Sequence, residues 1–106
     1  MNDRELLEAA AKAAGIELIA WTKFFDEWKF ACNPCGEPWN PLTDDGDALR
    51  LAVKLRICFG PNFDEDMAVA FGREGRNICE PYGVDPYAAT RRAIVRAAAE
   101  IGKTNP

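Results

Sequence analysis

The closing segment of the chain carries the strongest structural signal in the sequence. Asp85 is a typical N-cap residue, Pro86 suits the first position of a helix, and Gly102 is a typical helix stop. The apolar residues between them recur at helical spacing and predict a core face at Tyr87, Ile94, Ala97, Ala98 and Ile101. We therefore predict a helix over residues 86–101 whose alanine-rich face permits close packing.

Two further helices are predicted upstream. Asn2 with Glu5 three positions later forms a capping-box pattern, and Gly15 ends a helix over residues 3–14. A second helix, over residues 44–55, is capped by Thr43 or Asp44. Its apolar stripe comprises Ala48, Leu51, Ala52 and Leu55, widened by Leu49 and Val53. The width of this stripe predicts a helix that is packed on much of its circumference.

Residues 16–31 fit two patterns. Alternation from Leu18 to Phe24, a turn at residues 25–27 and a return through Trp28 and Phe30 describe a hairpin, whereas the same aromatic residues also fit one face of a continuous helix. Aromatic and β-branched enrichment favours the hairpin.

The runs RICFG, MAVAFG and ICEPYG, between residues 56 and 83, read as more strands. Short gaps between strands favour antiparallel pairing. We predict one α+β domain over residues 1–106, with a mostly antiparallel sheet of four or five strands and three helices in a layered α-β-α sandwich.

Composition limits the chemistry that this chain can perform. It has no histidine and no serine, which excludes Ser-His-Asp and Cys-His devices and makes an enzyme the least favoured class. The net charge of −4 disfavours nucleic-acid binding. No run is long and apolar enough for a membrane span, and the acidic start MNDRELLEAA is unlike a signal peptide. We expect a cytoplasmic protein with reduced thiols.

The stretch CNPCGEPWNP, residues 32–41, has three readings. Zinc needs four ligands, and the candidates are Cys32, Cys35, Cys58 and Cys79, but the last two do not form the second close pair of a zinc knuckle. A redox role needs a helix that begins directly after Cys35, but prolines occupy the positions around and after the cysteine pair. We expect a metal-free, stiff loop anchored by Trp39, with the two single cysteines as small core residues, and keep zinc as the alternative cofactor.

Charged residues gather at three places. Asp44, Asp45 and Asp47 fit capping of a helix start better than a calcium loop. Arg91, Arg92 and Arg96 are too few for a nucleic-acid site and predict a solvated helix face. The turn Asp64-Glu65-Asp66 is a solvated loop or a negative patch that meets a basic partner.

The stretches RELLEAAAKAAGIE, WNPLTDDGDALRLAVKLRI and DPYAATRRAIVRAAAEIGK resemble a family of small phage and prophage proteins, the phage ABA sandwich domain. The portions that vary relative to that family are residues 18–36 and 58–82. The resemblance implies an α-β-α layered fold and a mobile-element origin, and it assigns no catalytic residue and no metal.

These observations favour a non-enzymatic protein that binds, and by binding inhibits, a host protein with a basic surface, such as a defence or CRISPR complex. A second copy of the chain, in a homodimer, is a further candidate partner. The alternative function is that of a zinc-stabilised structural or nucleic-acid-adaptor module. The expected contact residues are large aromatics of the hairpin and the acidic turn: Trp21, Phe25, Trp28, Asp64, Glu65 and Asp66.

Overall fold

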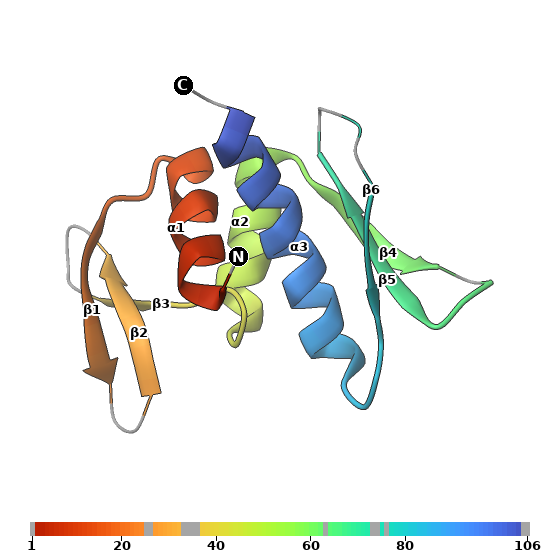
Figure 1. Cartoon of the computed structure of the whole chain (residues 1–106), viewed down its shortest axis with the longest axis horizontal. Helices are drawn as coiled ribbons and strands as arrows, with labels where there is room; N and C mark the ends of the chain where they lie inside the picture. The colour runs from red at the N-terminus through yellow and green to blue at the C-terminus, as the bar shows by residue number, and fades with distance from the viewer. Residues whose placement is uncertain are drawn as a thin grey trace.

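The computed structural model describes residues 2–24, 27–32, 37–62, 64–72, 75 and 77–104. The elements in chain order are α1 (Asp3–Ala14), β1 (Leu18–Phe24), β2 (Glu27–Cys32), β3 (Glu37–Trp39), α2 (Asp45–Leu55), β4 (Cys58–Asn62), β5 (Met67–Phe71), β6 (Asn77–Pro81) and α3 (Pro86–Thr104). The strands form two antiparallel sheets, ordered β1-β2-β3 and β4-β5-β6. The helices lie between these two sheets (Figure 1).

The predicted α+β class, the three helices and the antiparallel pairing are confirmed, but the predicted single sheet is wrong. The strands of the described residues divide into two sheets of three, and the layer order is sheet, helices, sheet rather than helices, sheet, helices. The reason is the position of α3. Its alanines are buried on several sides, because α3 packs against α1 and α2 as well as against β5 and β6.

The helix starts follow from the capping residues that the sequence contains. The Glu5 amide donates to Asn2 Oδ1 at 2.8 Å, and the Asp47 amide donates to Asp44 Oδ2 at 2.8 Å. The Tyr87 amide donates to Asp85 Oδ1 at 3.0 Å. Each contact supplies an acceptor to an amide that has no partner within its helix, so the predicted starts are confirmed.

The predicted stop at Gly102 is wrong, because α3 continues to Thr104. A Cβ built on Gly102 would lie only 2.0 Å from the Ala9 carbonyl oxygen of α1. Gly102 therefore serves close contact between two helices rather than helix termination.

The first sheet, β1-β2-β3, presents a row of rings to the helices. Trp21 pairs with Phe30 across β1 and β2, and Phe30 pairs with Trp39 across β2 and β3. The rings of Trp21 and Phe30 meet edge to face with centroids 4.7 Å apart, and the Arg4 guanidinium of α1 lies over both. Phe30 and Trp39 belong to the buried core.

This arrangement confirms the hairpin and the anchoring role of Trp39. It corrects the loop prediction in part, because Glu37–Trp39 form a strand that pairs with β2. The row of rings explains the pairing, since Trp39 reaches the core by lying beside Phe30. Residues 33–36 lie outside the described residues.

The second sheet, β4-β5-β6, has two unlike faces. On the inner face Ala68, Ala70 and Ile78 are buried against α3. The residues of the outer face, on alternate positions of the register, are uncharged: Cys58, Gly60, Asn62, Met67, Val69, Phe71, Asn77, Cys79 and Pro81. Small inner residues let the sheet lie close to α3.

Candidate functional site

Exposed large apolar side chains gather in one half of the molecule. Among the described residues they are Ile19, Leu49, Val53, Phe59, Phe71, Val84 and Tyr87. Apart from Ile19 in β1, all belong to α2, the second sheet, the turn between β6 and α3, or the start of α3. Of these residues, Leu49, Phe59 and Tyr87 line one hollow, and clustered apolar exposure marks a contact surface more often than scattered single residues do.

A groove lies at the centre of this half, where α2, β4 and the start of α3 meet. It has a volume of about 340 Å³. Its lining residues are Asp45, Ala48, Leu49, Phe59, Gly60, Pro61, Tyr82, Tyr87, Thr90, Arg91 and Ile94. Ala48 and Ile94 are buried at its base, whereas Leu49, Phe59 and Tyr87 are 53%, 43% and 73% exposed. We call this feature the α2–β4–α3 groove.

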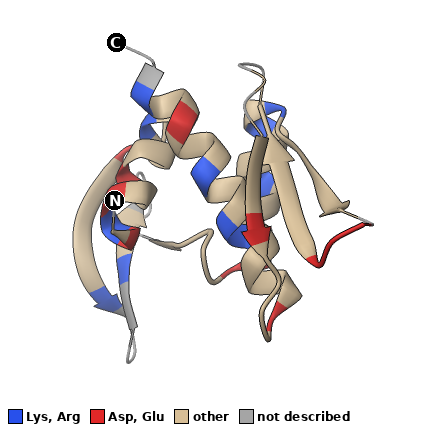
Figure 2. Cartoon of the chain, turned by 45° about the vertical axis from the view of Figure 1, so that its right-hand side comes forward, with Lys and Arg blue, Asp and Glu red and all other residues tan. Residues whose placement is uncertain are grey.

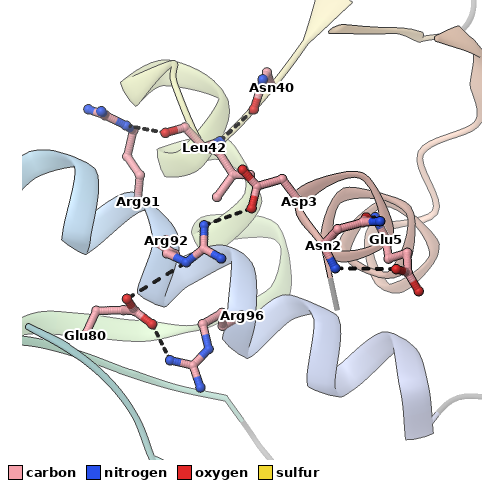
Figure 3. A network of polar contacts seen from close by, with 9 residues as sticks. All are labelled: Asn2, Asp3, Glu5, Asn40, Leu42, Glu80, Arg91, Arg92 and Arg96. Carbon is pink, nitrogen blue, oxygen red and sulfur yellow. Dashed lines mark hydrogen bonds and ion pairs between the residues drawn. The ribbon is translucent and has the colours of Figure 1, made fainter. Parts of the chain in front are cut away.

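One side chain fixes the two helical walls of the groove. Arg91 Nη1 of α3 donates to Asp45 Oδ1 of α2 at 2.6 Å, and its Nε donates to the Leu42 carbonyl oxygen at 2.9 Å. The Leu42 amide in turn donates to Asn40 Oδ1 at 3.0 Å (Figure 3). The Arg91 side chain is only 16% exposed. Its two hydrogen bonds therefore hold the segment before α2 against α3.

The three arginines of α3 do not form the solvated face that the sequence predicted. Arg92 pairs with Asp3 of α1 at 3.0 Å and lies 3.9 Å from Glu80 of β6, and Arg96 also pairs with Glu80 (Figure 3). With Arg91 bound to α2, each arginine bridges α3 to another element. Because α3 is surrounded by other elements, the cationic ends of its arginines meet acidic residues of those elements.

The surroundings of the groove are strongly acidic. The segments that border it, residues 40–50, 58–66 and 81–91, contain seven carboxylates and two arginines. Their formal charge of −5 exceeds the −4 of the whole chain. Both arginines are held in ion pairs, with Asp45 and with Asp47. Figure 2 shows the acidic turn between β4 and β5 at the far end of the second sheet.

The acidic turn lies beside the groove. Asp64, Glu65 and Asp66 are exposed between β4 and β5, as the sequence predicted. The Asp66 carbonyl oxygen accepts a hydrogen bond of 2.9 Å from the amide of Tyr82, which lines the groove. The turn therefore contributes negative charge at one end of the groove.

The predicted aromatic contacts lie elsewhere, in the first sheet. Trp21 is half-buried between Phe30 and the Arg4 guanidinium. Trp28 lies in β2 opposite Lys23, and its side chain is not among those described, while Phe25 lies outside the described residues. These residues are not brought together with the acidic turn, because the helices separate the first sheet from the second. Their role as contact residues stays a prediction.

The three cysteines among the described residues are divided between the two sheets. Cys32 ends β2 on one side of the helices, and Cys58 and Cys79 lie exposed on the outer face of the second sheet on the other side. The prediction that the latter two are core residues is wrong, because the register turns them away from α3. β5 separates their strands, which sets their backbones roughly 10 Å apart. The described residues contain no group of three or more metal-ligating side chains.

Most of the groove is not predicted by the sequence patterns. The patterns place Tyr87 on a core face and Leu49 and Val53 on a packed helix surface, whereas all three are exposed. Tyr87 lies in the first turn of α3 and is 73% exposed. The signal that could have been used is the excess width of the α2 stripe, since α2 covers the core with Ala48, Leu51 and Ala52 and, in part, with Leu55.

No family model, curated protein or solved structure matches the chain. The resemblance to the phage ABA sandwich domain therefore stays a prediction. No helix in the described part of the chain is long and apolar enough to cross a membrane.

Proposed function

We propose that the protein acts by binding another protein, without catalysing a reaction, and that the α2–β4–α3 groove is its docking site. The observation that carries the proposal is the groove itself, whose rim presents Leu49, Phe59 and Tyr87 to solvent above a buried apolar base. Aromatic residues around a desolvated hollow are typical of interface hot spots. The predicted acidic turn is part of this site, since it lies next to Tyr82.

The expected phage origin indicates which organism supplies the partner. On the resemblance to the phage ABA sandwich domain, the partner is a protein of a bacterial host, and a nucleic-acid-handling defence complex such as a CRISPR effector is the leading candidate. Such complexes have basic surfaces, which suit an acidic ligand because complementary charge speeds and orients association.

The docking site is tested by affinity capture with matched baits. Three baits are immobilised on resin and incubated with bacterial extract: the wild-type chain, a Leu49→Ala/Tyr87→Ala variant and an Ile19→Ala control. The captured proteins are quantified by mass spectrometry. Ile19 is 56% exposed in the first sheet, so its loss removes a comparable apolar surface away from the groove. We expect one set of proteins to be retained by wild type and Ile19→Ala and lost from the groove variant. Equal recovery by all three baits contradicts the proposal.

The proposal also holds that the protein works without a bound metal. Its support is the separation of Cys32 from Cys58 and Cys79 by the helical layer. We expect substoichiometric zinc in protein purified without added metal. Stoichiometric zinc that is lost on Cys32→Ser substitution contradicts this part and favours the zinc-stabilised alternative.

A further inference from the structure

The apolar surface at the groove is elongated. Leu49, which lines the groove, and Val53 lie one turn apart on α2, a rise of about 6 Å, and are 53% and 70% exposed. The stripe that they form continues the groove along α2 beyond its lining residues. A small molecule fits the hollow but leaves this stripe uncovered, whereas a rod-shaped ligand that lies along α2 covers both.

Strand addition to the bordering sheet is disfavoured. The edge strand beside the groove, β4, contains Pro61, and the opposite edge strand, β6, ends at Pro81. Proline has no amide hydrogen to donate to a new strand, and it is a common means of protecting sheet edges. A ligand at this site is therefore bound by side chains rather than by backbone pairing.

Anions have little to bind here. The first amides of α2 and α3 already have acceptors, since Asp44 caps α2 and Asp85 accepts from the Tyr87 and Ala88 amides. The bordering segments carry a formal charge of −5, and the exposed carboxylates of Asp64, Glu65 and Asp66 take part in no ion pair among the described residues. Residues 51–56, along the Leu49–Val53 stripe, add Lys54 and Arg56 and bring the formal charge to −3. The site remains net negative, and its charge is complementary to a cationic ligand.

We infer, on the basis of the proposed function, that the groove receives a positively charged amphipathic helix of the partner protein. Its apolar residues, spaced i, i+3 or i+4, and i+7, enter the groove and cover the Leu49–Val53 stripe. Its lysine or arginine residues flank that face and meet the acidic turn and the start of α2. The apolar contacts supply affinity, and the charges supply orientation and selectivity against acidic helices.

The test uses three synthetic peptides of about 18 residues, long enough to form a helix on binding. The first has leucine at i, i+3, i+4 and i+7 with flanking lysines, the second has glutamate in place of lysine, and the third is a scrambled form of the first. Each is titrated into the isotopically labelled full chain, and amide chemical shifts report where and how tightly it binds. A Leu49→Ala variant and the Ile19→Ala control are titrated alongside.

We expect the lysine peptide to shift amides at the groove and along α2 and to bind about tenfold more tightly than the glutamate peptide at low salt. The preference is expected to shrink at about 0.5 M salt, where the Debye length is only a few ångströms. Leu49→Ala weakens this binding, and Ile19→Ala does not.

Five outcomes overturn the inference. Equal groove binding by both amphipathic peptides removes the charge preference but leaves the groove as a docking site. Binding by the scrambled peptide as strong as by the lysine peptide removes the helix. Shifts confined to the first sheet or to the outer face of the second place the ligand elsewhere, and concentration-dependent groove shifts without peptide identify a second copy of this chain as the occupant. If no peptide binds while affinity capture succeeds, the helix inference fails and the proposed function stands.

Discussion

The two sheets bury their inner faces against opposite sides of the helical layer with different side chains. The first sheet uses a row of large rings, Trp21, Phe30 and Trp39, which fill the space next to α1. The second sheet uses Ala68 and Ala70, which bring β5 close to α3. One sheet thus reaches the core through long side chains, and the other through close approach of its backbone.

The consequence is that aromatic residues have opposite roles in the two halves. In the first sheet the described rings of Trp21, Phe30 and Trp39 pack in or against the core and offer little surface for contact. In the second half the alanines fill the inner face, and Phe59, Tyr82 and Tyr87 lie at its margin, where they line the groove. Whether a ring is free for binding depends on the size of its neighbours and not on its local sequence.

The largest expected effect is on the first sheet. Phe30 is 5% exposed between Trp21 and Trp39, so Phe30→Ala leaves a cavity and is expected to lower the free energy of unfolding by about 3 to 5 kcal/mol. Ile19→Ala in the same sheet is the control, with an expected change within about 0.5 kcal/mol. Urea unfolding followed by circular dichroism measures both. Similar losses for the two variants show that the rings are not core.

A second test separates the shared helices from the sheets. Gly102→Ala places a Cβ against the Ala9 carbonyl oxygen, so α1 and α3 must move apart, and we expect a loss of about 2 to 3 kcal/mol. Gly60→Ala is the control, because a Cβ at Gly60 meets no atom within 4 Å. The tryptophans lie in the first sheet and the tyrosines in the second half, so fluorescence of each reports one half. Unfolding of one half before the other contradicts a shared helical core.

The capping residues explain how far the sequence could predict this fold. Asn2, Asp44 and Asp85 mark helix starts through contacts within a few residues, so local sequence was sufficient. Gly102 and Tyr87 were misread because a glycine at a helix contact and a glycine at a helix stop look alike in sequence, as do a buried and an exposed ring at helical spacing. Their roles depend on which element lies opposite, which periodicity does not specify.

The groove was missed, and the layer order was wrong, for the same reason. Sequence patterns identify the apolar face of each element but not the element that packs against that face. All strands were therefore expected in a single sheet. The acidic turn was placed correctly, because its position depends only on the hairpin between β4 and β5.

A smaller effect is expected where α3 meets the second sheet. Glu80→Gln removes the charge that pairs with Arg96 and lies near Arg92, and we expect a loss of about 1 kcal/mol, limited by the partial exposure of both arginines. Glu8→Gln, in a pair with Arg4 whose side chains are more than half exposed, is the control and should change stability by less. The difference is measured by urea unfolding at low and high salt. A loss for Glu80→Gln no larger than that for Glu8→Gln shows that this bridge does not hold sheet and helix together.

The smallest effect on stability is expected at the acidic turn. Asp64, Glu65 and Asp66 are exposed and outside any ion pair among the described residues, so replacing all three with lysine should leave the melting temperature nearly unchanged. The association rate with a basic partner or the lysine peptide should fall about tenfold at low salt, and the difference should fade at high salt. Stopped-flow fluorescence measures these rates. An unchanged rate at low salt removes the turn from the site.

Photo-crosslinking compares the two halves most directly. Benzoylphenylalanine is placed at Tyr87 at the groove or at Trp21 in the first sheet, each aromatic residue being replaced by another, and both proteins are irradiated in the same bacterial extract. Because Tyr87 is 73% exposed and Trp21 packs against Phe30, we predict a discrete covalent adduct from position 87 and none from position 21. An adduct from position 21 with none from position 87 would place the docking surface on the first sheet and contradict the account.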